Sequence, residues 1–185
     1  MYHYEKLRII SILHHNMLLK VLIIVFSRTG TTSRVANIIK EETGSDIFNI
    51  TSLVDYSGIG GYWKGCSHQI AGTIPDIEEI PSIDDYDLIY VGGPTWIFKP
   101  AGPIMKLLEK LDFNHKKVIP FFTCGGNFGH SFEKFAELAK NADIIGQGAF
   151  RGAEQLNDEK LKERVTSWMK KLPKIEKEAE KQNEL

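Results

Sequence analysis

The feature that most constrains this chain is a run of six apolar residues, Val21 to Phe26, followed at once by the hydroxyl-rich segment Ser27 to Thr32. Most of the apolar residues are β-branched and no polar residue interrupts them, which predicts a strand buried on both faces, as in a parallel sheet. The pattern of Ser33 to Glu42 then predicts a helix. Backbone N–H groups and hydroxyls at a helix N-terminus favour a phosphate. We therefore expect a phosphorylated small molecule at the carboxyl end of this strand.

Further strands and helices alternate along the rest of the chain. One helix is expected at Pro103 to Leu111, and a second is expected to begin with Ser131 as its N-cap. A third is expected from Asn157 or Asp158 to Trp168. The glycine-rich segment 51–82 is the least regular, with one helical piece around Trp63 to Ala71. The other expected strands are 46–50, 87–91, 117–122 and 143–150. Such alternation predicts a single α/β domain with a doubly wound parallel sheet.

Three segments that follow predicted strands are rich in glycine, hydroxyl groups and aromatic rings: 27–32, 92–100 and 123–129. In doubly wound sheets ligands bind outside the carboxyl ends of the strands, where the winding reverses. We expect the three segments to form one binding site at that edge.

Composition limits the partners and the compartment. The 23 Lys and Arg residues nearly balance the 24 Asp and Glu residues, which argues against nucleic-acid binding. Only two cysteines occur, too few for a disulfide framework, and we expect a cytoplasmic protein. The apolar stretch Ile9 to Leu19 is too short for a membrane span. We expect residues 1–17 to be an extension outside the core, residues 18–172 to form the domain, and residues 173–185 to be a charged tail.

Several phosphate chemistries do not fit the segment 27–32. It has no Gly-Lys-Ser/Thr sequence of a nucleotide-hydrolysing loop and no cysteine to act as a phosphatase nucleophile. A phospho-accepting receiver domain would need an Asp after the third strand, where this chain has Gly92. Arg28 is the one nearby cation, and no carboxylate stands there to bind a metal. This composition favours a permanently bound monophosphate.

Together, Ser27-Arg-Thr-Gly-Thr-Thr32, Gly92-Gly-Pro-Thr-Trp96 and Thr123-Cys-Gly-Gly-Asn-Phe-Gly129 resemble the loops of the flavodoxin family. The resemblance covers roughly residues 18–172. It implies a five-stranded parallel sheet in the order 2-1-3-4-5 and non-covalently bound FMN. The phosphate would lie in the first loop and the flavin ring between the second and third.

The resemblance also assigns cofactor-binding roles. Trp96 would stack on the flavin ring, because it follows Gly-Gly-Pro-Thr in a loop. Phe128 has two open roles, the other face of the ring or a core contact, and Cys124 is expected to be an inert thiol beside the ring. The residues assigned to the cofactor are Ser27, Arg28, Thr29, Gly30, Thr31 and Thr32 in the first loop, Pro94, Thr95, Trp96, Ile97 and Phe98 in the second, and Thr123, Cys124, Gly125, Gly126 and Phe128 in the third.

Two features depart from the family. Where flavodoxins commonly carry a glycine whose peptide flips toward the flavin, this chain has Ile97, and a β-branched residue resists positive φ. Flavodoxins are usually acidic around the flavin, whereas Lys64, His68, Lys99 and His130 lie in or near these loops. This charge argues against docking of the usual basic redox partners and leaves room for an anionic substrate.

Two functions follow from these observations. The first is an electron carrier between redox partner proteins, with no catalytic acid or base and no metal. The alternative is an NAD(P)H-dependent FMN-containing reductase of quinones or similar small electron acceptors. Segment 51–82 would then wall a substrate pocket or pair the subunits of a homodimer.

Overall fold

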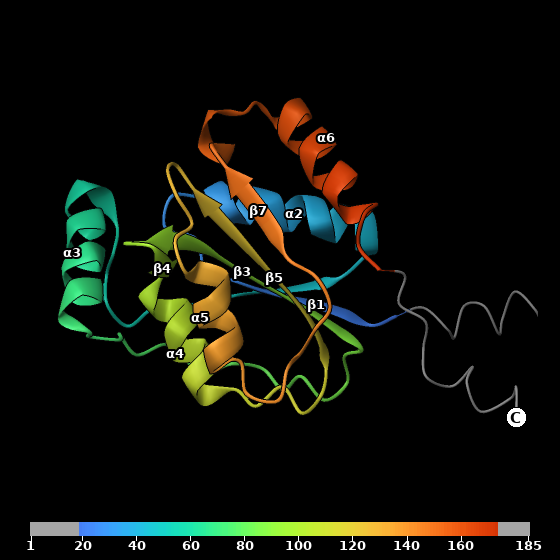
Figure 1. Ribbon diagram of the computed structural model, residues 1–185, viewed down its shortest axis with the longest axis horizontal. Coiled ribbons are helices and arrows are strands. Elements are labelled where there is room, and N and C mark those ends of the chain that lie inside the picture. Colours follow the sequence, from blue (N-terminus) through green and yellow to red (C-terminus); the bar gives the residue numbers. More distant parts are fainter. Residues whose placement is uncertain (1–18, 174–185) are drawn as a thin grey trace, which may run out of the picture.

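The computed structural model describes residues 19–173, so the predicted extension and residues 174–185 of the predicted tail lie outside it. Helices cover both faces of a twisted central sheet (Figure 1). The strands are β1 (Val21–Val25), β2 (Asp46–Asn49), β3 (Leu88–Trp96), β4 (Lys99–Pro100), β5 (Lys117–Cys124), β6 (Asp143–Ile144) and β7 (Gly148–Arg151). The helices are α2 (Thr31–Thr43), α3 (Gly58–Ala71), α4 (Gly102–Lys110), α5 (Ser131–Leu138) and α6 (Asp158–Met169), with a 3₁₀ turn, η1, at Ala153–Gln155.

The sheet confirms the predicted doubly wound topology. Its order is β2-β1-β3-β5-β6, and the strands along this path pair in parallel. The predicted fifth strand, 143–150, is two short strands, because β6 pairs with the start of β5 and β7 with its end. The first strand therefore lies between the second and third, which places the carboxyl ends of β1, β3 and β5 at one edge.

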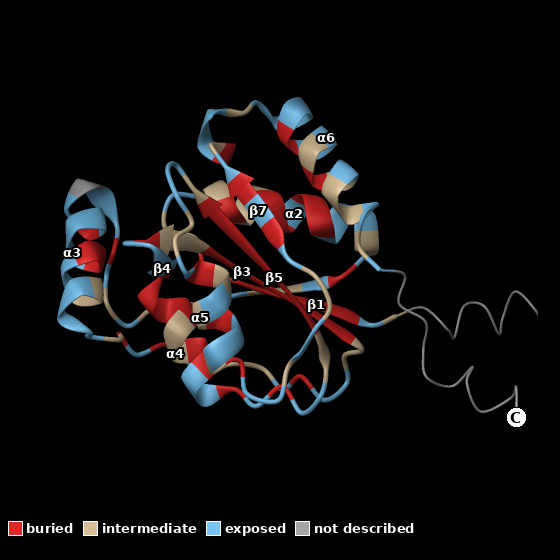
Figure 2. Cartoon of the chain, viewed as in Figure 1, coloured by how far each residue is buried: buried red, intermediate tan, exposed pale blue. Residues whose placement is uncertain are grey.

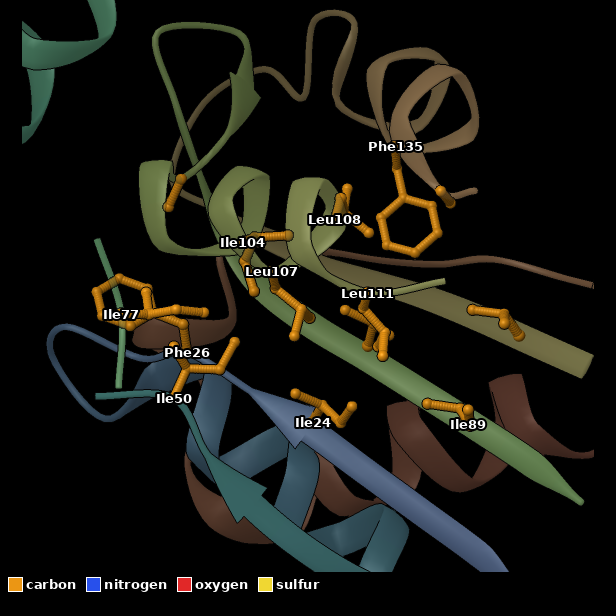
Figure 3. Close-up of a cluster of buried hydrophobic side chains, with 14 of the residues drawn as sticks. Ile24, Phe26, Ile50, Ile77, Ile89, Ile104, Leu107, Leu108, Leu111 and Phe135 are labelled. Carbon is orange, nitrogen blue, oxygen red and sulfur yellow. The ribbon is translucent and has the colours of Figure 1, made fainter. Parts of the chain in front are cut away.

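Two apolar layers hold the sheet, and its central strands are buried almost throughout (Figure 2). Under α4 and α5, residues such as Ile24, Ile89, Leu107 and Phe135 fill one layer (Figure 3). The opposite layer packs α2 and α6 against the other face, as with Ile39 of α2. Burial on both faces explains why β1 is a continuous apolar run.

The expectation of a loop at 92–100 is wrong for most of its length. β3 continues to Trp96, and Gly92 to Pro94 pair with Phe121 to Thr123 of β5. The two glycines permit this pairing, because a Cβ on Gly92 would collide with the Phe121 ring and one on Gly93 would lie 2.5 Å from Ile104. Trp96 then pairs with Lys99 of β4 in a tight antiparallel hairpin.

The starts of α3 and α5 differ from the expectations. α3 begins at Gly58, five residues before the predicted Trp63. His130, not Ser131, is the N-cap of α5; the Ser131 hydroxyl instead donates to the Phe128 carbonyl oxygen over 2.7 Å. The prediction for α6 is confirmed, since the Asn157 side chain accepts from the Lys160 amide.

Candidate functional site

A cleft of about 160 Å³ opens where β1, β3 and β5 end. It brings together residues of all three predicted segments, along with Tyr62 and Glu154. The predicted residues that line it are Arg28, Thr29, Thr31, Thr32, Pro94, Thr95, Trp96, Thr123, Cys124 and Gly125. The structure thus assembles one site from the three segments, while Ser27, Gly30, Ile97, Phe98, Gly126 and Phe128 lie outside the lining.

The first segment leads into the N-terminus of α2, where helix geometry favours an anion. Gly30 is the N-cap with φ of 85°, a left-handed conformation that favours glycine, and no acidic residue stands in the first turn of the helix. The hydroxyls of Thr29 and Thr31 lie 3.4 Å apart, and the buried Thr32 hydroxyl lies 2.8 Å from that of Thr123. The first amides of a helix have no intrahelical acceptor, so hydroxyl and N–H groups converge on this end.

Ser27, at the start of the same segment, carries a buried hydroxyl that can still form a hydrogen bond. Among the described residues, its Oγ is the buried side-chain polar atom that has no hydrogen-bond partner. A buried hydroxyl without a partner costs about 1–3 kcal/mol. A phosphate oxygen bound by this segment is an acceptor that would remove that cost.

Arg28 links the first segment to α3. Its guanidinium donates to the Gly58 carbonyl oxygen over 3.0 Å and lies 5.7 Å from the centre of the Tyr62 ring. Interaction with the Cys66 side chain and burial raise the pKa of Tyr62, so the phenol stays protonated at neutral pH. The N-terminal half of α3 therefore forms a wall of the cleft through Tyr62, whose aromatic ring lies over the loop cation.

Trp96 lines the cleft but is 3% exposed, and it lies at the end of β3, not in the loop that we expected. The Phe26 and Tyr56 rings meet it edge to face, at 5.8 and 5.1 Å between ring centres. A Cβ on Gly65 would lie 2.7 Å from the Trp96 ring, so α3 packs directly on it. Trp96 is therefore part of the core as well as of the cleft wall, and its stacking on a ligand ring stays a prediction.

The hairpin tip corrects our expectation for Ile97. Both Ile97 and Phe98 have positive φ, 45° and 63°, as a two-residue hairpin turn with the favoured twist requires. The closure between Trp96 and Lys99 imposes this conformation in spite of the β-branched side chain. As a result Ile97 and Phe98 are 39% and 56% exposed at the tip.

The third segment supplies the far wall. Burial raises the pKa of the Cys124 thiol, which keeps it protonated and unreactive near neutral pH. Phe128 packs at 6.0 Å from the Phe132 ring and joins the core under α5, so of its two roles the structure shows the core contact. The Glu154 carboxylate approaches Gly125, where a Cβ would lie 3.2 Å from Oε1.

Sequence reasoning missed two cleft residues, Tyr62 and Glu154. Glu154 follows the last strand of the sheet, so the rule that ligands bind beyond strand ends could have found it. No local sequence pattern predicted that Tyr62 lines the cleft, because glycine has a low helix propensity and the start of α3 is rich in it.

The arrangement can bind an anion at one end and a planar group beyond it. Hydroxyls, a helix N-terminus and Arg28 define the anionic end, and Pro94, Thr95 and Trp96 define the other. Within residues 19–173 no cluster of three or more His, Cys, Asp or Glu side chains is placed to hold a metal ion. In the same range no helix is both long and apolar enough to cross a bilayer.

Comparisons with known proteins agree with this geometry. A family model described as flavodoxin matches residues 20–172. Flavodoxin 1 of Salmonella typhimurium and flavodoxin 1 of Escherichia coli K12 are each 27% identical over 124 residues, which is 64% of this chain. The matched part spans 57% of the length of these relatives.

Solved structures share the fold. A flavoprotein in complex with FMN from Lactobacillus acidophilus NCFM superposes with a TM-score of 0.64 at 26% identity, covering 82% of this chain and 99% of that one. A putative flavoprotein from Bacteroides uniformis superposes with a TM-score of 0.66 at 25% identity, covering 82% of this chain and 98% of that one.

Proposed function

This chain belongs to the flavodoxin family, and from that premise we propose that it binds FMN in the cleft and carries electrons between redox partners. The observation that carries the proposal is the hydroxyl-lined N-terminus of α2, where the orphaned Ser27 hydroxyl lies in the same loop as Arg28. When bound, FMN supplies the redox chemistry, and the protein supplies binding, orientation and electrostatics.

The residues present fit the phosphate of FMN. Thr29, Thr31 and Thr32 offer hydroxyl donors, and Arg28 offers a charge at the same end. We infer that a monophosphate suits this set, since the cleft lining contains no second cation to neutralise a longer phosphate chain. The flavin ring would extend toward Pro94, Thr95 and Trp96.

Charge around the ring end supports a carrier of low potential. Glu154 is the single carboxylate in the cleft lining, and no lysine lines it. Negative charge here disfavours electron uptake by the bound flavin. We expect Glu154→Gln to raise its reduction potential, with the exposed α6 variant Glu159→Gln as a control that leaves the potential unchanged.

One observation favours the alternative, a reductase that accepts electrons from NADH or NADPH. Helix α3 from segment 51–82 walls the cleft through Tyr62, which is 42% exposed and presents a flat ring beside the site. A nicotinamide or a quinone is a planar group that such a ring could contact.

Two experiments test these functions. FMN titration measures binding: Thr29→Ala or Thr31→Ala should weaken it about tenfold or more, because each removes a hydrogen bond to a charged group. The exposed Thr73→Ala is the matched control, expected to bind as the unmodified protein does. Failure of the unmodified protein to bind FMN would overturn both functions.

The second experiment separates the carrier from the reductase. NADH or NADPH is added to the FMN-loaded protein without oxygen, and the yellow absorbance is followed. Rapid bleaching would refute the pure carrier. Absence of bleaching, together with reduction by a partner reductase, would refute the direct reductase.

Partners and location follow as proposals. We expect redox proteins or a small electron acceptor to meet the cleft edge, and the cytoplasm to be the compartment, on the basis of the two unpaired cysteines. A homodimer formed through segment 51–82 stays a prediction that a sedimentation measurement can test.

A further inference from the structure

Thr95 differs from the other cleft threonines in the direction of its hydrogen bond. Its Oγ1 lies 2.9 Å from the Ser131 Oγ, and the Ser131 Oγ lies 2.7 Å from the Phe128 carbonyl oxygen. A carbonyl oxygen can only accept, so the single hydroxyl hydrogen of Ser131 goes to Phe128. Ser131 is then left with lone pairs toward Thr95, and Thr95 must be the donor in that pair.

Burial fixes this direction. Ser131 is fully buried at the start of α5, and Thr95 is half-buried in β3, where it pairs with Pro100. Water does not reach Ser131 to offer another partner, and an unmade hydrogen bond there is costly. The only hydrogen on the Thr95 hydroxyl is therefore committed to Ser131. What the hydroxyl can offer to the cleft, which Thr95 lines, is its lone pairs.

The pairs at the anion end are not fixed in this way. In the Thr29–Thr31 pair and in the Thr32–Thr123 pair, either hydroxyl can be the donor. A hydroxyl of each pair is thus available to donate to a phosphate oxygen. The cleft therefore has a donor-rich end at α2 and an acceptor at Thr95.

We propose that Thr95 Oγ1 accepts a hydrogen bond from an N–H or O–H group of the ligand in the cleft, with Ser131 as the positioning residue that holds it in this role. The inference rests on the proposed function, since FMN carries a phosphate at one end and a ring N–H group at the other. A ligand bound in the opposite direction would place its phosphate against the Thr95 acceptor. At neutral pH that phosphate is mostly a dianion with no hydrogen to donate. Thr95 thus selects both the orientation of the ligand and a ring that carries a donor.

The test compares FMN binding by the unmodified protein and by Thr95→Val, Thr95→Ser and Ser131→Ala, with folding checked by urea unfolding. Thr95→Val keeps the shape but removes the acceptor, and should weaken FMN binding about 3- to 10-fold. Thr95→Ser keeps the hydroxyl and should restore binding. Ser131→Ala frees the Thr95 hydroxyl to turn, and should weaken binding although it touches no ligand.

The reduction potential of the bound flavin reports the direction of the bond. Reduction adds a hydrogen to N5 of the ring, so loss of an acceptor leaves the potential unchanged or makes it more negative. Loss of a donor to N5, which binds the oxidised ring better than the reduced one, makes the potential more positive. A more positive potential in Thr95→Val would overturn the proposal, as would binding equal to that of the unmodified protein.

Equal losses in Thr95→Ser and Thr95→Val would also overturn it, because packing and not the hydroxyl would then be responsible. If Thr95→Val does not fold, Ser131→Ala decides: unchanged affinity and potential refute the positioning role. Should the unmodified protein bind no FMN, the proposed function fails first and this inference falls with it. The two failures are therefore distinguishable.

Discussion

Helices α2 and α3 border the same cleft but are held in place by different means. α2 buries five residues against the sheet, among them Val35, Ile38 and Ile39. α3 has four glycines in its 14 residues, and of its described side chains Cys66 alone is buried. In Figure 1 α3 lies at the left end of the molecule, away from α2 and α6.

What holds α3 is a set of polar contacts to its flanks. Arg28 donates to the Gly58 carbonyl oxygen, and the Gln69 side chain donates to the carbonyl oxygen of Pro100 over 2.9 Å. The Tyr56 hydroxyl lies 3.0 Å from Nδ1 of His68. The glycines complete the contact by letting the helix backbone approach Tyr56 and Trp96.

The difference teaches where the cleft is rigid and where it can adjust. Apolar burial dominates stability, so the end of the cleft formed by α2 shares the global stability of the domain. A segment with few buried apolar contacts opens locally at lower cost. The α3 wall is therefore the part of the site that can adapt to a ligand or a partner.

The largest expected effect comes from truncating a buried side chain of α2. Ile39 is fully buried, and Ile39→Ala should lower the free energy of unfolding by about 2–5 kcal/mol, measured by urea denaturation. The matched variant on α3 is Ile70→Ala, where the side chain is 76% exposed and the change should stay within about 0.5 kcal/mol. Similar losses in the two variants would remove the distinction between the helices.

The second largest effect is a loss of stability at alkaline pH, caused by Tyr90 in the apolar layer under α2 and α6. Burial raises the pKa of Tyr90 to about 12, and its ring lies 6.2 Å from that of Trp168 in α6. Because the pKa of Tyr90 is higher in the folded than in the unfolded chain, the neutral phenol stabilises the fold. This contribution is fully present below pH 10 and is lost as the pH rises toward 12. The loss should reach about 2–3 kcal/mol in urea unfolding across this window. Tyr90→Phe should remove that part of the pH dependence, and a Tyr90→Phe protein with an unchanged profile would contradict the assignment.

Two neighbouring glycines of α3 give a smaller, local effect. A Cβ on Gly61 would collide with the Tyr56 carbonyl oxygen, whereas a Cβ on Gly60 would meet nothing within 4 Å. Gly61→Ala should cost about 1–3 kcal/mol and speed amide hydrogen exchange in α3 while leaving α2 protected. Gly60→Ala should instead stabilise by about 0.5–1 kcal/mol. Faster exchange in both helices of Gly61→Ala would show that α3 does not open independently.

The smallest effect is expected at the ion pair that joins α2 to α6. Glu41 and Lys162 lie 2.9 Å apart with side chains 59% and 52% exposed, so water screens their attraction. Lys162→Gln should produce no measurable change in urea unfolding. Arg34→Gln is the contrasting variant, because Arg34 also donates to the Ala153 and Leu156 carbonyl oxygens, and it should destabilise measurably. A destabilised Lys162→Gln protein would mean that charge, not packing, anchors α2.

The same comparison explains how far the sequence predicts the fold. α2 was expected at Ser33 to Glu42 and spans Thr31–Thr43, because its apolar pattern is local and strong. Only a helical piece of α3 was expected, because its glycines act through close approach of the helix backbone to Tyr56 and Trp96. Trp96 is distant in sequence, and no apolar pattern marks the contact with Tyr56. Patterns predict elements that bury an apolar face, and miss those defined by backbone contact.

Prediction of the site was limited by pairing between distant strands. The local sequence Gly92-Gly-Pro predicts a loop, but these residues pair with Phe121 to Thr123 of β5 and so belong to the sheet. The phosphate segment needed no such partner, since a strand followed by hydroxyls and a helix defines it locally. Glu154 joined the cleft only through the pairing of β7 with β5.

The hairpin tip at Ile97 and Phe98 has an evolutionary consequence. Selection for stability alone would put Asn-Gly at two positive-φ positions in a two-residue hairpin, and this chain keeps two large apolar side chains there. Residues in such conformations cost about 1–3 kcal/mol each, so the tip lowers the stability of the folded chain. A thermostabilising design would replace these two residues first, and would remove the exposed apolar side chains of the tip along with the strain.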